Sequence, residues 1–149
     1  MGAVAPGGIV VWNDDVLAMT RVSDDRRNEA VARERAELER RVHAYRGDRE
    51  PVVVHGLDVI VVDDGLATGL TMIAALRATR ARGAAWIVCA VPVASPRGIA
   101  RVRPWCDEIV ALAAPHDFYG VSVFYGDFRQ VTDDDVVCLL AGLPVSAPE

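Results

Sequence analysis

Short apolar runs alternate with helical segments through the middle of the chain. The runs are rich in β-branched residues and apolar at consecutive positions, a pattern typical of strands covered on both faces. They are Val52–Val54, Val59–Val62, Trp86–Val91 and Glu108–Leu112. Their alternation with helices predicts an α/β fold with a buried, mostly parallel sheet and right-handed crossovers.

Three further segments have helical patterns. Ser23 to Tyr45 is highly charged with a narrow apolar stripe, which predicts a helix lying on the surface. Leu70 to Arg82 is apolar on one face, and Gly83 is suited to end it as a C-cap. Pro92 to Arg103 predicts a loop and a short helix. Near the C-terminus, the capping-box spacing of Thr132 and Asp135 predicts a last short helix.

The start of the chain predicts one strand, Ile9 to Trp12, followed by a turn at Asn13-Asp14-Asp15. A chain of 149 residues is long enough for one domain. We therefore expect a single domain over residues 1–143 and a disordered tail over residues 144–149.

Composition narrows the classes of function. A net charge of -5 argues against a nucleic-acid partner, and all 16 basic residues are arginines. The three cysteines form no CxxC pair, which disfavours a zinc site and suits buried thiols in a reducing cytoplasm. The N-terminus lacks the features of a signal peptide, and no apolar run approaches the length needed to span a membrane. We expect a cytoplasmic protein without a membrane partner.

The segment Val59–Thr71 carries the candidate chemistry, because it predicts a strand, a tight turn and a helix start. Asp63 and Asp64 fall at the carboxyl edge of the sheet, where ligands of open α/β folds bind. The N–H groups at the helix start and the Thr68 and Thr71 hydroxyls suit a phosphate monoester. The carboxylates suit a neighbouring diol, so the two pockets together describe ribose 5-phosphate. The alternative is a structural turn, in which the acids and Thr68 cap local backbone without a ligand.

These thirteen residues resemble the signature of type I phosphoribosyltransferases: four apolar residues, two acids, and a turn ending in Thr-Gly-x-Thr. Arg33–Arg41 and Phe124–Gln130 resemble a poorly characterised bacterial group of proteins with this domain. The resemblance implies a Rossmann-like three-layer fold and transfer of a phosphoribosyl group from phosphoribosyl pyrophosphate, with Mg²⁺ bound alongside that substrate and no metal bound directly by the protein. It implies that Asp63 and Asp64 bind the ribose hydroxyls close to the positive charge that develops on the sugar. The residues implied to line the 5-phosphate pocket are Ala67, Thr68, Gly69, Leu70 and Thr71.

Two departures from the family pattern limit what it implies. Enzymes for 6-oxopurines have an Asp just before the Thr-Gly pair, and Ala67 cannot exchange a proton there, which disfavours hypoxanthine and guanine. The chain also begins in the middle of the family pattern, without a Gly-rich basic loop for pyrophosphate and without lysine. We therefore expect either a truncated or decayed member, without the first strand-helix unit, or a chain whose true start lies upstream; the chain as given should bind ribose 5-phosphate weakly. An exposed sheet edge would favour a homo-oligomer.

Other polar and aromatic residues are open to two interpretations. Phe118 and Tyr119 could stack on a base or simply pack, and His116 could contact a base or be solvated. Arg97 could reach a phosphate or lie at the surface. Arg40, Arg41 and Arg46 fit a charged helix face or a subunit contact better than a catalytic cluster.

Three other nucleotide- or phosphate-related classes do not fit. A response-regulator receiver needs a lysine and a phosphoacceptor Asp after a later strand, and neither is present. A P-loop needs Gly-Lys-Ser/Thr, and a dinucleotide fold needs GxGxxG. The remaining competitor of a phosphoribosyltransferase is a non-catalytic phosphoribosyl-binding or oligomerising module.

Overall fold

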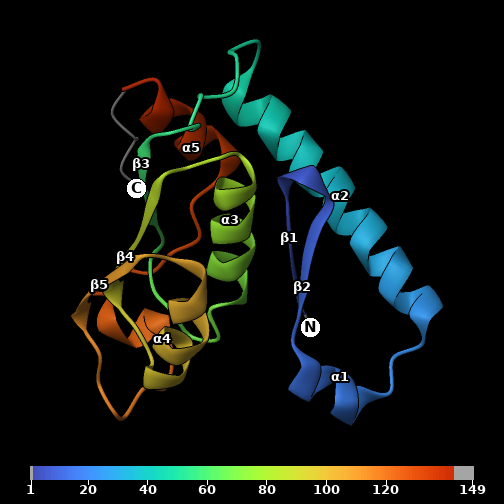
Figure 1. Cartoon of the computed structure of the whole chain (residues 1–149), viewed down its shortest axis with the longest axis vertical. Coiled ribbons are helices and arrows are strands. Elements are labelled where there is room, and N and C mark those ends of the chain that lie inside the picture. The colour runs from blue at the N-terminus through green and yellow to red at the C-terminus, as the bar shows by residue number, and fades with distance from the viewer. Residues whose placement is uncertain (1, 143–149) are drawn as a thin grey trace.

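The computed structural model describes residues 2–142. Its centre is a parallel sheet in the order β3–β4–β5, made of β3 (Asp58–Val62), β4 (Trp86–Val93) and β5 (Glu108–Ala113). Helix α3 (Leu70–Ala81) connects the first pair of strands, and α4 (Pro96–Val102) with η2 (Arg103–Trp105) connects the second. Successive right-handed crossovers that step in one direction put their helices on one face, and α3 and α4 do lie on the same face (Figure 1). The predicted α/β fold with a parallel sheet is confirmed.

The core lies between these helices and the covered face of the sheet. Leu76 of α3, Ile87 and Cys89 of β4 and Val102 of α4 are fully buried. Side chains alternate along β4, so every second residue enters this core. Helix α3 is covered on more than one side, since the consecutive residues Met72, Ile73 and Ala74 are all buried, and the prediction of a single apolar face is wrong.

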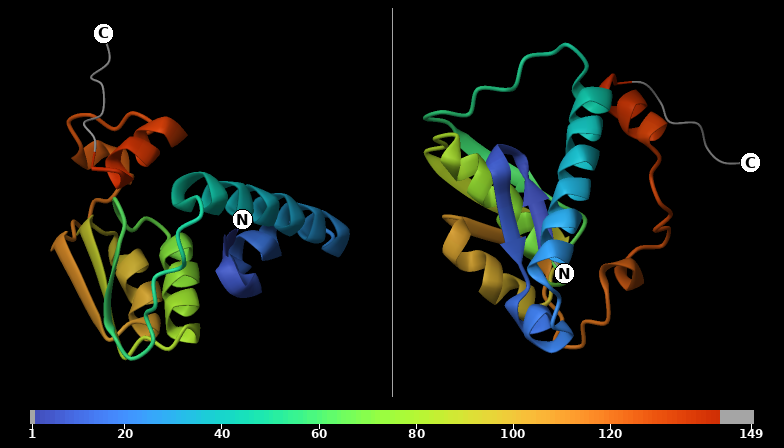
Figure 2. Two further views of the ribbon diagram at one scale, coloured as in Figure 1. Left: turned by 90° about the horizontal axis from the view of Figure 1, so that it is seen from above. Right: turned by 90° about the vertical axis from the view of Figure 1, so that its right-hand side faces the viewer.

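The N-terminal residues form a second layer on the far side of α3. Strands β1 (Gly2–Ala5) and β2 (Ile9–Trp12) pair as an antiparallel hairpin around the turn η1 (Pro6–Gly8) and pack against α3. After α1 (Asp14–Thr20), the long helix α2 (Asp24–Arg46) crosses the outside of the hairpin (Figure 2). Across the molecule, the layers are therefore the sheet, then α3 and α4, and then the hairpin with α2.

The C-terminal segment returns across the molecule through η3 (Val121–Phe124) to α5 (Asp133–Leu140), which packs against α2. Tyr45 of α2 donates a hydrogen bond to Asp133 at 2.5 Å, and Arg40 forms an ion pair with the same carboxylate at 2.7 Å. Thr132 caps α5 in the predicted capping box. The expected tail at residues 144–149 lies outside the described residues.

Several predicted elements are wrong in detail. Val52–Val54 forms no strand; no neighbouring strand pairs with it, and the side chains of Val52 and Val53 are exposed. Asp14 and Asp15 are the first residues of helix α1 and do not form the predicted turn. Carboxylates at the N-terminus of a helix favour helix formation. Strand β1 was not predicted, and β4 continues through Pro92 to Val93.

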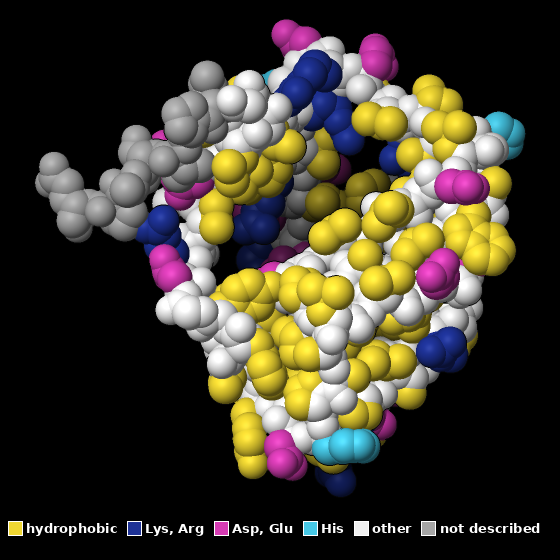
Figure 3. Space-filling view, turned by 90° about the vertical axis from the view of Figure 1, so that its left-hand side faces the viewer, with side chains coloured by type: hydrophobic (Ala, Val, Ile, Leu, Met, Phe, Trp, Pro, Cys, Tyr) yellow, Lys and Arg dark blue, Asp and Glu magenta, His cyan; other side chains and the backbone are white. Residues whose placement is uncertain are grey.

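The expectation that the sheet is buried on both faces is also wrong for the described residues. On the face away from α3 and α4, Ile60 is 66%, Val62 71% and Leu112 82% exposed. Figure 3 looks at this side of the molecule, and hydrophobic side chains gather there. We call this surface, made by Ile60, Val62, Val110 and Leu112, the open face. No helix within residues 2–142 is long and apolar enough to cross a membrane.

Candidate functional site

The acidic pair lies at the carboxyl end of β3, as predicted. The backbone N–H of Asp63 still bonds to β4, through Ala90, at 3.4 Å, and the N–H of Asp64 donates to the Asp63 carboxylate at 3.0 Å. Asp63 is half-buried and Asp64 is exposed. Burial raises the pKa of Asp63, and the adjacent charge of Asp64 acts in the same direction.

The turn after the acids is fastened to the end of β4. Leu66 is buried; its N–H donates to Val93 at 2.9 Å and its carbonyl accepts from Ser95 at 2.8 Å. Ala67 and Thr68 are exposed, and Gly69, with a φ of 76°, starts α3. A Cβ on Gly69 would lie 2.8 Å from Cγ2 of Val102, so both the backbone angle and the contact with α4 require glycine.

Unpaired amide groups surround this turn. Among the described residues, none accepts a hydrogen bond from the backbone N–H groups of residues 67–71. These N–H groups precede α3 or occupy its first positions, where the helix contributes positive partial charge. Thr68 and Thr71 are exposed beside them, so their hydroxyls can add to the same donor set. The arrangement suits an oxyanion such as a phosphate monoester.

The C-terminal segment supports the acidic side of the turn. The Tyr125 hydroxyl donates to the backbone carbonyl of Asp64 at 2.7 Å. Gly65 packs so closely on Val121 that a Cβ would lie 2.8 Å from both of its methyl groups. Sequence reasoning missed Tyr125 and Val121 as parts of the site. The signal available was the aromatic segment from Phe118 to Phe128, which does not by itself say where that segment packs.

The structure separates the two candidate base-contacting aromatics. Phe118 is half-buried and stacks on Phe124, with ring centroids 5.6 Å apart. Tyr119 is 86% exposed. His116 is exposed as well. Of the two aromatics Phe118 and Tyr119, Tyr119 is the one whose ring is largely exposed.

The candidate arginines are all held by carboxylates or lie on helix faces. Arg97 and Arg101 of α4 both form ion pairs with Asp15 of α1, the second at 2.7 Å. Arg40 and Arg41 bind the carboxylate of Glu37 at 2.8 and 2.7 Å. The hydrogen bond from Arg40, together with a smaller effect of the one from Arg41, lowers the pKa of Glu37 to about 2. Arg46 lies in the last turn of α2. The cluster on α2 therefore supports the helix and its contact with α5.

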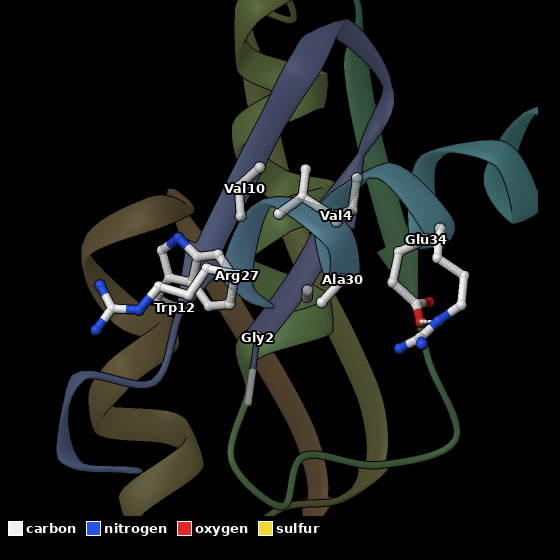
Figure 4. Close-up of a pocket in the computed structure, with 10 residues that line it drawn as sticks. Gly2, Val4, Val10, Trp12, Arg27, Ala30 and Glu34 are labelled. Atoms are coloured by element: carbon white, nitrogen blue, oxygen red, sulfur yellow. Dashed lines mark ion pairs between the residues drawn. The ribbon is translucent and has the colours of Figure 1, made fainter. Parts of the chain in front are cut away.

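A cavity of about 290 Å³ lies elsewhere, between the hairpin and α2. Figure 4 shows Val4, Val10 and Trp12 of the hairpin facing Arg27 and Glu34 of α2. None of the residues that line it belongs to the turn at residues 63–71. This cavity is separate from the candidate phosphate site.

The groups in this turn that could contact a metal ion are the carboxylates of Asp63 and Asp64. Residues 2–142 contain no group of three or more His, Cys, Asp or Glu arranged to hold a metal ion. Magnesium in phosphoryl sites is commonly held by one or two carboxylates together with phosphate oxygens of the substrate. Asp63 and Asp64 fit that donor set.

Comparisons with known proteins test the family independently of this geometry. The family model described as phosphoribosyl transferase domain matches residues 15–127. A Mycobacterium tuberculosis protein (strain ATCC 25618 / H37Rv) named "Putative phosphoribosyl transferase Rv0571c" is 37% identical over 139 residues, which are 93% of this chain and 31% of that protein. An equivalent protein of strain CDC 1551 / Oshkosh, MT0597, gives the same values. The chain thus spans about a third of the length of these relatives.

One solved structure matches most of the chain. The crystal structure of TT1426 from Thermus thermophilus has a TM-score of 0.74 and 42% identity; the match covers 95% of this chain and 66% of that chain.

Proposed function

Because the chain belongs to the phosphoribosyl transferase domain family, we propose that residues 63–71 bind phosphoribosyl pyrophosphate or ribose 5-phosphate. The observation that carries the proposal is the row of unpaired amides at residues 67–71 beside two carboxylates. The amides and the Thr68 and Thr71 hydroxyls hold the 5-phosphate. Asp63 and Asp64 accept hydrogen bonds from the ribose 2- and 3-hydroxyls. The phosphate cannot take the place of the ribose hydroxyls at Asp63 and Asp64, because carboxylates repel a phosphate.

The proposed reaction transfers the phosphoribosyl group to or from a nitrogenous base or a similar acceptor. In the direction of transfer to the base, the acceptor nitrogen forms a bond to carbon 1 of the sugar while pyrophosphate leaves with the electrons of the bond that breaks. Positive charge develops on the ring as that bond lengthens. Carboxylates fixed near that ring stabilise this charge more in the transition state than in the ground state, which lowers the barrier. Asp63 is suited to the role because it is half-buried, where electrostatic interactions are screened less than in water.

Magnesium is proposed to arrive with phosphoribosyl pyrophosphate, near Asp63 and Asp64. When bound, it would neutralise negative charge on the pyrophosphate. The protein's own contribution is to hold the sugar and its 5-phosphate in position.

The position of Ala67 restricts the acceptor. Its methyl group cannot give a proton to a purine nitrogen or take one from it, so the site offers no acid at this place for a 6-oxopurine. Exposed Tyr119 is the aromatic available to stack on a base. We therefore propose an acceptor other than hypoxanthine or guanine.

A non-catalytic phosphoribosyl-binding module is the second candidate. It is favoured by one observation: Arg97 and Arg101, on the helix that supports the turn, are both paired with Asp15. Cations that are already neutralised contribute little to holding pyrophosphate. In this case the sugar phosphate binds, but no group is transferred.

The test is calorimetric titration with ribose 5-phosphate, and with phosphoribosyl pyrophosphate plus Mg²⁺. Wild-type protein should bind both, and Asp63→Asn and Asp64→Asn should each weaken binding about tenfold or more. Asp58→Asn is the matched control, since Asp58 is an exposed carboxylate at the opposite end of the same strand. Wild-type protein that binds neither ligand would refute the proposal. Release of pyrophosphate in the presence of candidate bases separates the enzyme from the binding module.

A further inference from the structure

Ser95 is the one buried polar residue among the buried side chains of residues 2–142, with 8% of its surface exposed. It lies between β4 and α4, outside the family signature at residues 59–71. Its hydroxyl donates to the carbonyl of Ala67 at 2.6 Å and accepts from the N–H of Gly98 at 2.8 Å. Its own N–H donates to the carbonyl of Leu66 at 2.8 Å. Its carbonyl also accepts from the N–H of Ile99 at 3.0 Å, so this one residue makes two bonds to the phosphate turn and two to α4.

These bonds determine where the amides of the turn point. In a planar trans peptide, the C=O of one residue and the N–H of the next point in opposite directions. Since Ser95 draws the carbonyls of Leu66 and Ala67 towards itself, the N–H groups of Ala67 and Thr68 point away from it. Ala67 and Thr68 are exposed, and these two N–H groups have no partner among the described residues.

The packing around Ser95 leaves the turn little freedom. A Cβ on Gly98 would lie 2.8 Å from the carbonyl oxygen of Leu66 and 3.0 Å from that of Ala67. Helix α4 therefore approaches the turn as closely as backbone allows. Ser95 caps this helix and bonds the turn with the same hydroxyl, so the two positions are coupled.

We propose that Ser95 is a positioning residue that orients the Ala67 and Thr68 amides for the 5-phosphate without touching the ligand itself. This inference rests on the proposed function. Loss of the hydroxyl frees the Ala67 peptide to rotate, and the energy of re-orienting it must then come from ligand binding.

The test compares ribose 5-phosphate affinity among folded variants. S95A should weaken binding about tenfold, the equivalent of losing one well-oriented hydrogen bond to a charged group. S95T, which keeps the hydroxyl, should stay within about threefold of wild type. S23A is the matched control, because Ser23 caps α2 through the same kind of bond and lies away from the turn. S23A should leave binding unchanged.

A site-resolved signal distinguishes positioning from general destabilisation. In wild-type protein, ribose 5-phosphate should shift the ¹⁵N–¹H resonances of residues 67–71; in S95A the shifts at Ala67 and Thr68 should shrink more than those at Leu70 and Thr71. If S95A fails to fold, S95C carries the same comparison, because a thiol of similar size is a weaker donor.

The outcomes separate the two proposals. If wild-type protein binds and S95A binds equally well, the positioning role is wrong and the proposed function stands. If wild-type protein does not bind ribose 5-phosphate, the proposed function fails and this inference fails with it.

Discussion

Asp63 is a residue at which folding and the proposed function make opposite demands. Its carboxylate is half-buried next to Asp64, and burial raises its pKa. A charged group in that place destabilises the folded chain unless something compensates for its lost hydration. The hydroxyls of a bound ribose would provide that compensation. Active-site carboxylates commonly carry such a cost.

The sign of the pH dependence follows from the raised pKa. The folded chain keeps the Asp63 proton to a higher pH than the unfolded chain, so stability falls as pH rises from 3.8 through the raised pKa of Asp63. Asp63→Asn removes this cost while keeping an oxygen that accepts from the Asp64 N–H. The variant should therefore be more stable than wild type at pH 7, by roughly 0.5–1 kcal/mol.

Urea unfolding of Asp63→Asn and wild type from pH 3 to pH 8 measures this effect. The gain should be largest at neutral pH and should vanish in acid, and Asp58→Asn should show no such trend. A variant that is less stable than wild type at pH 7 would contradict the account of Asp63.

Between elements, the decisive contact is the one between the start of α3 and the side of α4. Gly69 meets Val102 and Gly98 there, and it also has a positive φ. Either feature excludes a side chain, but they act differently. The backbone angle penalises any Cβ through local strain, whereas the close contact forces the two helices apart and moves the amide row.

Gly69→Ala should therefore destabilise the protein by about 2–4 kcal/mol and abolish binding of ribose 5-phosphate. Gly7→Ala is the control, since Gly7 has a φ of 78° and a ψ of 16°, close to the angles of Gly69, with no atom within 4 Å of a built Cβ. It should cost only about 1 kcal/mol and leave binding intact. Thermal unfolding and calorimetry measure both. Equal losses in the two variants would show that strain alone matters and that helix contact does not.

At the scale of the whole molecule, the topology of residues 2–142 leaves the open face without a covering helix. Both crossover helices lie on one side, so Ile60, Val62 and Leu112 remain largely exposed on the other (Figure 3). Apolar surfaces of this kind mark interaction sites. The homo-oligomer expected from the sequence therefore remains a proposal, with the open face as the surface through which two copies would meet.

Replacing Ile60 and Leu112 together by serine should weaken self-association at least tenfold, because each side chain loses about 1 kcal/mol or more of burial. Sedimentation velocity over a range of concentrations measures the change. Met19→Ser is the control, since Met19 is 82% exposed on α1, away from the sheet. Wild-type protein that sediments as a monomer throughout would refute the proposal.

Family and fold class were predictable from the sequence, and the comparisons confirm them. The strand, turn and helix at residues 58–81 were also predictable, because β-branched runs, a glycine turn and helical spacing are local signals. Local signals failed where strand formation depends on pairing with a neighbouring strand. Val52–Val54 has strand composition without a partner strand, and Gly2–Ala5 has weaker strand composition but pairs with β2.

The roles of the proposed site residues remain predictions, although the structure brings the acidic pair and the free amides together at residues 63–71. Phe118 and Tyr119 show the limit of residue type as a guide. They are adjacent aromatics, yet one packs on Phe124 and the other faces solvent.

The sequence alone determined the chemistry of the turn: carboxylates, then amides freed by a helix start, within thirteen consecutive residues. Residue type and spacing along the chain are enough to place these groups next to one another, whereas the direction in which the amides point depends on tertiary contacts. Only the tertiary structure decided what holds that turn and what covers the sheet. Ser95 reaches it from 28 residues away and Tyr125 from 61, and such contacts depend on how the strands are ordered. The same ordering put both helices on one face and left the other open.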